Sequence, residues 1–195
     1  MDFNLTEERA MLRDMLQRFL GERYDHEARR KLIASGAPYD AGILTELAKL
    51  GILGAMFSED DGGFGGTGFD LLVVFEELGR AGTIEPVVGS SVLAGGLLAE
   101  LGNASQKALI GQVIGGVTVL ALAHGEPQSR YDLSHVHTTV QADGGQIVLN
   151  GTKTHVVNGA QAETLVVSAR ENGAKDDEVG ISLFLVPLAL EGVTC

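Results

Sequence analysis

A hydrophobic strand pattern runs into a turn at Leu120-Ala121-Leu122-Ala123-His124-Gly125-Glu126-Pro127. A second turn follows about thirty residues later, at Asn150-Gly151-Thr152-Lys153-Thr154-His155-Val156-Val157-Asn158-Gly159. Between the two turns the sequence alternates over residues 135–143, and Asp143-Gly144-Gly145 is a hairpin signal. Further strand patterns lie at residues 165–169 and 181–187. We therefore predict a small antiparallel β-barrel or sandwich domain over residues 117–195.

The first 116 residues carry helical patterns instead. Thr6 and Asp40 are predicted helix N-caps, and Asn103 with Gln106 three residues later predicts a capping box. Apolar residues recur at helical spacing in the first helix: Met11, Leu12, Met15, Leu16, Phe19 and Leu20. Further helices are expected near residues 26–33, 69–80 and 87–101. The expected fold class is α+β, with an N-terminal all-α domain over residues 1–116 and the β-domain over residues 117–195.

The composition excludes several classes of protein. The chain has 195 residues, 45% of them hydrophobic, and a formal net charge of −12. These values are typical of a globular fold and provide no basic face for nucleic acid or for an anionic membrane surface. Cys195 is the only cysteine, which excludes an intrachain disulfide and a cysteine metal cluster. No signal peptide or membrane span is visible, so we expect a cytoplasmic protein.

Two glycine-rich features have both a structural and a functional interpretation. Gly63, Gly65 and Gly68 match the letters of a dinucleotide-binding fingerprint, but a helical pattern and an acidic loop precede them. We therefore predict a tight glycine connection between helices. The predicted helix over residues 87–101 contains many small residues, namely Gly89, Ser90, Ser91, Ala94, Gly95, Gly96 and Ala99. Such a helix can pack closely against its neighbours or leave room for a ligand chain.

His135 and His137 are two residues apart, so on a strand they would share one face and could bind a metal ion. No third ligand stands at a recognisable spacing, and an exposed strand pair is the favoured interpretation. No metal site is predicted.

Several short motifs follow one another in an order typical of one enzyme family. They are Leu50-Gly51-Ile52-Leu53-Gly54, Glu59-Asp60-Asp61-Gly62-Gly63-Phe64-Gly65, Glu76-Glu77-Leu78-Gly79-Arg80, Gln106-Lys107, Glu126-Pro127, and Asn150-Gly151-Thr152-Lys153. Together they make the whole chain resemble the N-terminal and middle domains of the acyl-CoA dehydrogenase family. In that family a C-terminal helical bundle usually carries the catalytic glutamate, and the sequence here does not reach it, either because it is a fragment of a longer protein or because the third domain is missing. No residue here is therefore assigned as the catalytic base.

The resemblance implies an FAD-dependent oxidoreductase of fatty acid metabolism. Such enzymes introduce a double bond between the α and β carbons of an acyl-CoA thioester, and the β hydrogen leaves as hydride to the flavin. The implied partners are an acyl-CoA substrate, further subunits in a homo- or hetero-oligomer, and an electron-transferring flavoprotein as electron acceptor.

The resemblance also implies a flavin site at the two turns. The residues carried over are Leu122, His124, Gly125, Arg130, Tyr131, His155, Val156 and Val157. Gly125 replaces a threonine that usually bonds the flavin, Arg130 and Tyr131 replace a Gly-Ser pair, and Val157 replaces a hydroxyl residue. Three hydroxyl positions are thus lost or altered, with Tyr131 retaining a displaced one.

The leading hypothesis is an acyl-CoA dehydrogenase-like flavoprotein or one subunit of such an enzyme, and the altered positions suggest the less canonical subunit of a heteromeric dehydrogenase. An alternative is a non-catalytic scaffold subunit that has lost its flavin. A third interpretation, a flavin monooxygenase on the same fold, is favoured by none of these residues. Arg130 could meet a phosphate, occupy the flavin space or be solvated. His155 could lie against a flavin ring or in a surface turn. Lys153 and Glu126 are expected to be structural.

Overall fold

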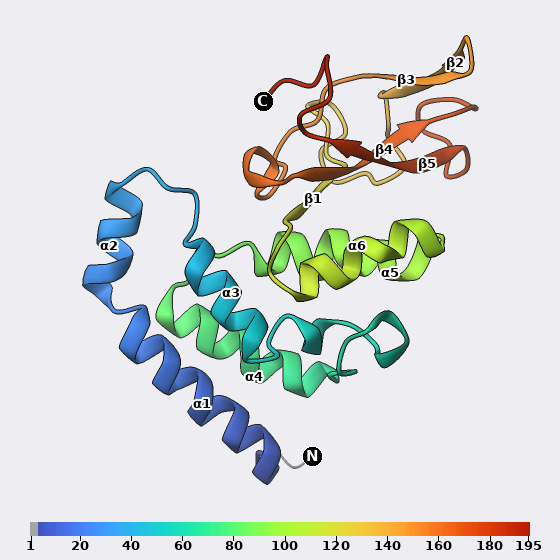
Figure 1. The fold of residues 1–195 in the computed structure, drawn as a ribbon. Coiled ribbons are helices and arrows are strands. Elements are labelled where there is room, and N and C mark those ends of the chain that lie inside the picture. The colour runs from blue at the N-terminus through green and yellow to red at the C-terminus, as the bar shows by residue number, and fades with distance from the viewer. Residues whose placement is uncertain (1–3) are drawn as a thin grey trace. The chain divides into compact units, whose positions relative to one another are not determined.

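The structure is a computed structural model and describes residues 4–195. The chain divides into two compact units, which are described separately. The first contains residues up to 87 together with residues 96–117, and the second contains residues 88–95 and 118–195. The first unit is helical and the second holds the sheet, so the α+β class is confirmed (Figure 1). No helix within residues 4–195 has the length and hydrophobicity needed to cross a bilayer.

The helical unit contains α1 (Glu7–Arg23), α2 (His26–Ala34), α3 (Ala41–Lys49), α4 (Gly68–Ala81), α5 (Gly96–Leu101) and α6 (Ala104–Ile114), with short 3-10 turns η1 (Gly54–Met56) and η2 (Glu59–Asp61). The predicted caps are confirmed: Thr6 accepts from the backbone N–H of Arg9, and Asp40 accepts from those of Gly42 and Ile43. Asn103 and Gln106 form the predicted capping box. These side chains satisfy backbone donors that have no partner within the helix.

The α1 helix packs against α4 along a stripe of apolar and polar contacts (Figure 1). Arg9 Nε donates to Asp70 Oδ1 at 2.8 Å, and the Arg9 guanidinium lies 5.3 Å from the centre of the Phe69 ring. In the second half of each helix, Gln17 of α1 donates to the buried carboxylate of Glu77 of α4 at 3.0 Å. Fully buried apolar side chains form the core of this unit: Leu16, Leu47, Ile52, Leu53, Val74, Ile110 and Val113.

The glycine-rich segment forms a loop between η2 and α4, and no strand borders it. The loop folds back on the preceding turn, because Phe64 N donates to Gly54 O at 2.9 Å and Gly65 N donates to Phe57 O at 2.8 Å. A side chain at Gly63 would come within 2.3 Å of Phe57 O. The prediction of a glycine connection between helices is therefore confirmed.

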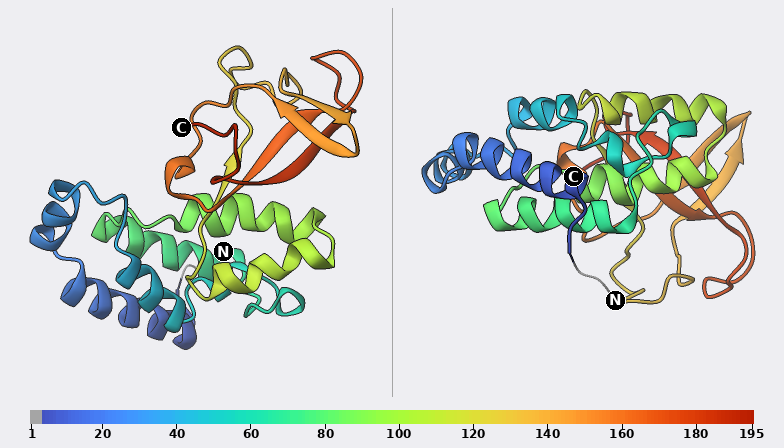
Figure 2. Two further views of the ribbon diagram at one scale, coloured as in Figure 1. Left: turned by 45° about the horizontal axis from the view of Figure 1, so that its top comes forward. Right: turned by 90° about the horizontal axis from the view of Figure 1, so that it is seen from below.

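The second unit holds a five-stranded sheet of β1 (Leu120–Ala123), β2 (Thr139–Asp143), β3 (Gln146–Asn150), β4 (Thr164–Arg170) and β5 (Ile181–Pro187). The order is β1-β4-β2-β3, and β5 pairs with β4 along its whole length. Figure 2 shows the β4–β5 pair as a twisted ribbon coloured orange to red. The β4 strand is almost entirely buried.

The prediction of a wholly antiparallel sheet was wrong in this detail, because the sheet is mixed. The β1 strand runs parallel to β4, with Leu120 opposite Thr164, and β2 also meets β4 in parallel at Thr139 and Arg170. A long connection that contains the β2–β3 hairpin returns the chain to the side of β1, which allows the parallel pairing. The hairpin itself is as predicted: Gly144 and Gly145 both have positive φ, as a tight two-residue turn requires.

Two predicted elements begin or divide differently. The strand expected over residues 135–143 starts only at Thr139, because the Glu126 carboxylate takes the backbone N–H groups of His137 and Thr138. The helix expected over residues 87–101 consists of a π-helical segment, η3 (Val87–Gly95), followed by α5.

Candidate functional site

The two turns singled out in the sequence meet in the second unit. The β1 strand ends at Ala123, and the carbonyl of Gly125 accepts a hydrogen bond from the backbone N–H of Thr154 at 2.7 Å. Lys153 Nζ donates to the carbonyl of His124 at 3.2 Å. An added Cβ at Gly125 would lie 3.0 Å from Thr154 O. Glycine therefore allows the backbone at 125 to lie closest to the backbone at 154. The segments 122–126 and 153–157 therefore form one joint corner.

A buried ion pair holds this corner together. Lys153 Nζ lies 2.8 Å from Glu126 Oε1, and the exposed fractions of the two side chains are 9% and 1%. Glu126 also accepts from the Thr138 hydroxyl at 2.6 Å, from the N–H groups of Thr138 and His137, and from Gln128 Nε2. Lys153 donates in addition to Ser168 Oγ at 3.0 Å. Both charged groups are thus saturated with partners and are structural.

The pKa values of this pair follow from burial and hydrogen bonding. Burial alone would raise the pKa of Glu126, but the hydrogen bonds from Lys153, Thr138 and His137 outweigh it and lower the pKa to about 2. Burial lowers the pKa of Lys153, and its hydrogen bond to Glu126 opposes that shift. Glu126 is therefore ionised throughout the neutral range.

His124 and Leu122 lie next to this pair. The Nδ1 atom of His124 is 2.9 Å from Ser168 Oγ, on the strand beside β1. Burial, followed by the charge of Lys153, lowers the pKa of His124 from its ordinary value, which favours a neutral imidazole. Leu122 is half-buried within a strand whose other residues are buried.

Arg130 and Tyr131 lie in the exposed loop that follows Glu126. Tyr131 is 99% exposed, and Leu133 two residues later is 74% exposed. Arg130 has a φ of 51°, a left-handed conformation that is uncommon for a residue with a side chain. The loop is pinned at its start, because Glu126 and Ser129 exchange hydrogen bonds of 3.0 Å.

His155, Val156 and Val157 continue the second turn. His155 is exposed and has a φ of 53°, and Val157 is 51% exposed. Gly89 of η3 lies against this turn, since an added Cβ there would come within 2.7 Å of Asn158 Oδ1 and 3.3 Å of Val157 Cγ1. Ser90 Oγ accepts from the N–H of Leu120 at 3.0 Å. The small residues at 89 and 90 thus serve close packing.

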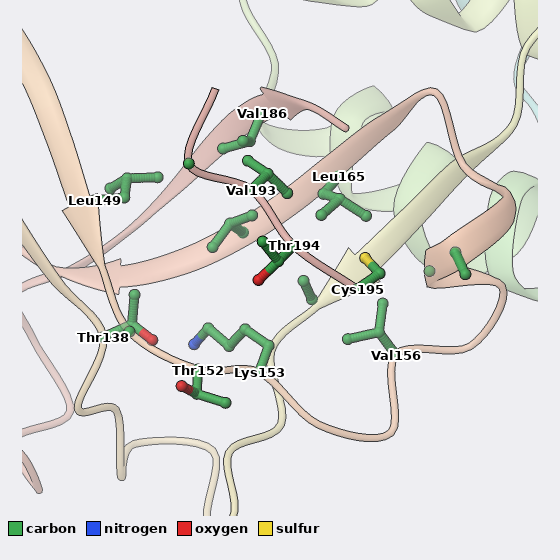
Figure 3. A pocket seen from close by; sticks show the side chains of 16 residues that line it. Thr138, Leu149, Thr152, Lys153, Val156, Leu165, Val186, Val193, Thr194 and Cys195 are labelled. Atoms are coloured by element: carbon green, nitrogen blue, oxygen red, sulfur yellow. The ribbon is translucent and has the colours of Figure 1, made fainter. Parts of the chain in front are cut away.

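A cavity of about 440 Å³ opens on one side of the sheet (Figure 3). Its apolar lining includes Ala123, Leu149, Val156, Leu165, Val167, Val186 and Val193. Figure 3 shows the Lys153 side chain at the rim, with its amino group directed toward Thr138. Of the eight residues proposed to bind flavin, only Val156 lines this cavity. The other seven lie on the joint corner and the 127–134 loop.

Sequence reasoning missed several residues that shape the corner. Thr138 and Ser168 complete the network of Glu126, Lys153 and His124, yet isolated hydroxyl residues in strand patterns give no signal of such a role. Arg170 is 6% exposed at the end of β4 and donates to six backbone carbonyls, those of Ser134, Val136, Asn172, Lys175, Asp177 and Val179. The only sign of this role in the sequence was a charged residue at the end of a hydrophobic strand pattern.

Comparisons with known proteins identify the family. The family model for the acyl-CoA dehydrogenase N-terminal domain matches residues 6–113, and that for the middle domain matches residues 121–195. The chain is 30% identical over 193 residues to (2S)-methylsuccinyl-CoA dehydrogenase of Cereibacter sphaeroides, with 93% of this chain and 33% of that protein covered.

Two solved structures have the same fold. The butyryl-CoA dehydrogenase of Megasphaera elsdenii has a TM-score of 0.83 at 28% identity, covering 98% of this chain and 51% of that one. A chain of the ChsE4-ChsE5 complex of Mycobacterium tuberculosis has a TM-score of 0.86 at 25% identity, covering 98% and 50%. The sequence thus spans a third to a half of the relatives it matches. It belongs to the acyl-CoA dehydrogenase family.

Proposed function

We propose that this chain forms the N-terminal and middle parts, residues 1–116 and 117–195, of an FAD-dependent acyl-CoA dehydrogenase. The observation that carries the proposal is the joint corner, in which Gly125 O accepts from Thr154 N and Lys153 pairs with Glu126. This arrangement brings the segments 122–125 and 155–157 together on a rigid support. When bound, FAD accepts a hydride from the substrate.

The residues of the corner and of the 127–134 loop suit a flavin ring in one respect and depart from the family in another. Val157 and Tyr131 expose apolar surface of the kind a planar ring can cover. Gly125 and Val157 supply no side-chain hydrogen-bond donor. The chain would therefore hold the ring by apolar contact and backbone groups, with the hydroxyl of Tyr131 as a further donor.

The missing hydroxyls favour the less canonical subunit of a heteromeric enzyme. One relative of known structure is named as a complex of two proteins, ChsE4 and ChsE5. In this proposal a partner subunit supplies the catalytic base and an intact flavin site. The substrate is an acyl-CoA thioester of fatty acid metabolism, the electron acceptor is an electron-transferring flavoprotein, and the protein acts in the cytoplasm.

The same missing donors support a second candidate, a scaffold subunit without flavin. Each lost hydrogen bond to a buried partner costs about 1 kcal/mol or more, so two losses weaken flavin binding by roughly thirtyfold or more. The scaffold proposal predicts a colourless protein even when the partner is present.

The visible absorption spectrum separates the candidates. The protein is purified from its full reading frame, alone and co-expressed with a neighbouring dehydrogenase-like subunit. A flavin band that bleaches on addition of acyl-CoA supports the dehydrogenase, and its dependence on the partner supports the heteromer. Full flavin content in a homo-oligomer would exclude the heteromer, and no flavin in either preparation would leave the scaffold.

A further inference from the structure

The imidazole rings of His135 and His137 face each other with their Nε2 atoms. Their Nε2 atoms are 3.0 Å apart, and the ring centres are 4.7 Å apart with a tilt of 37°. His135 Nδ1 is hydrogen-bonded to the carboxylate of Asp176, on the loop between β4 and β5. A carboxylate accepts only, so Nδ1 of His135 carries the proton and its Nε2 presents a lone pair toward His137.

The pair is held by a buried anchor. Arg170 donates to the carbonyls of Ser134 and Val136, on either side of His135, and to those of Lys175 and Asp177, on either side of Asp176. The N–H of Val136 also donates to Lys175 O at 3.0 Å. One guanidinium therefore sets the backbone that carries both the histidines and the carboxylate, which preorganises the group.

We propose that His135 and His137 form a two-histidine site for a divalent transition metal, with Asp176 orienting His135. Two facing ring nitrogens require either a shared proton or a cation between them. A carboxylate bonded to the far nitrogen of a ligating histidine is the usual second partner in such sites. Asp176 and Asp132, whose carboxylate lies close to His135, add negative charge that favours a cation.

The two nitrogens are close enough to bind one metal ion without a large movement of either ring. With metal–nitrogen bonds of about 2.05 Å, two nitrogens on one metal lie roughly 3–3.3 Å apart, and the two Nε2 atoms are 3.0 Å apart. Imidazole nitrogen suits Cu²⁺ and Ni²⁺, which therefore serve as probes of the site. No three His, Cys, Asp or Glu side chains within residues 4–195 are grouped to hold a metal, so the proposed site needs water for its remaining ligands.

The inference is independent of the flavin proposal, since the histidines are exposed or half-buried surface groups that need no second subunit. The test is titration of the purified chain with Ni²⁺ by calorimetry and with Cu²⁺ by electron paramagnetic resonance. One equivalent should bind with two nitrogen ligands. H135Q and H137Q should each lose at least tenfold in affinity and retain one nitrogen, and D176N should lose about 10–100-fold.

The matched control is H26Q, which removes an exposed histidine of the helical unit. It should bind Ni²⁺ and Cu²⁺ as the unchanged chain does. Circular dichroism and thermal unfolding establish that each variant is folded, and the nitrogen count from the Cu²⁺ spectrum does not depend on stability. Equal affinity and an unchanged spectrum in H135Q and H137Q would show adventitious binding only and overturn the proposal.

Discussion

Lys153 Nζ and Glu126 Oε1 lie 2.8 Å apart in the interior of the second unit, where they join two turns that are separated by 26 residues of chain. Both residues belong to the motifs that relate this sequence to its family. Lys153 donates to His124 O, Glu126 Oε1 and Ser168 Oγ, so it connects the two turns with the neighbouring strand.

Substitution of Lys153 by methionine should destabilise the protein by about 3–5 kcal/mol, because it leaves a buried carboxylate without its countercharge. Chemical denaturation measures the change. The control is K49M, which breaks an exposed pair with Glu46 whose side chains are 65% and 38% exposed. K49M should cost less than about 1 kcal/mol, and an equal loss in the two variants would contradict a special role for the buried pair.

The acid sensitivity of the fold should depend on Glu126. Its pKa lies at about 2 in the folded chain against an ordinary value of 4.5, so folding favours the ionised form. The stability that the carboxylate contributes is complete above pH 4.5 and is lost as the pH falls toward 2. Urea unfolding of wild type and E126Q at a series of pH values measures the difference between their free energies of unfolding. This difference should become smaller as the pH falls from 4.5 toward 2. A difference that does not change with pH would contradict the assignment.

Arg170 should be more important to stability than its position at a strand end suggests. R170M removes the hydrogen bonds that Arg170 donates to six backbone carbonyls. We expect the free energy of unfolding to fall by about 3 kcal/mol or more, and the 171–180 loop to be cleaved faster by proteases. R170K should recover only part of this stability, because an ammonium group lacks the planar set of N–H donors of a guanidinium. R13M removes a surface pair with Asp14 and should stay within about 1 kcal/mol of wild type.

The glycine loop should tolerate a methyl group at one end and not at the other. A Cβ at Gly63 would meet Phe57 O at 2.3 Å and Gly54 O at 2.5 Å, so G63A should cost about 1–3 kcal/mol. Gly68 starts α4 and has nothing within 4 Å of an added Cβ. G68A should be neutral or stabilising by up to about 1 kcal/mol. Thermal unfolding compares the two, and an unaffected G63A would show that the loop can move aside.

Restoring a hydroxyl should improve flavin binding if the corner is a flavin site. V157T places a donor where the family usually has one, and a single hydrogen bond of about 1 kcal/mol corresponds to roughly fivefold tighter binding. Fluorescence titration with FAD, in the presence of the partner subunit, measures the effect. V148T, at a 45% exposed position on β3, is the control and should not change affinity. No gain in V157T would count against the assignment of Val157.

Local patterns were sufficient for the helix caps and for the hairpin turn. The caps at Thr6, Asp40 and Asn103 act on backbone groups within three residues, so the letters around them contain the whole interaction. The same holds for the hairpin at Gly144-Gly145, whose positive φ values only glycine adopts easily. The family could also be identified from ordered motifs, which the comparisons confirmed.

Contacts between distant segments were decided by the tertiary structure. Periodicity distinguishes strand from helix but not which strand becomes a neighbour, and so the parallel pairing of β1 with β4 was missed. Glu126 draws residues 137 and 138 out of the expected strand, and no local rule anticipates a carboxylate eleven residues away. The facing nitrogens of His135 and His137 needed Asp176 and Arg170 to be oriented. Hydrogen bonds between residues a few positions apart can be predicted from the local sequence. The partners of buried charged groups come from segments that are distant in sequence, and these meet only in the folded protein.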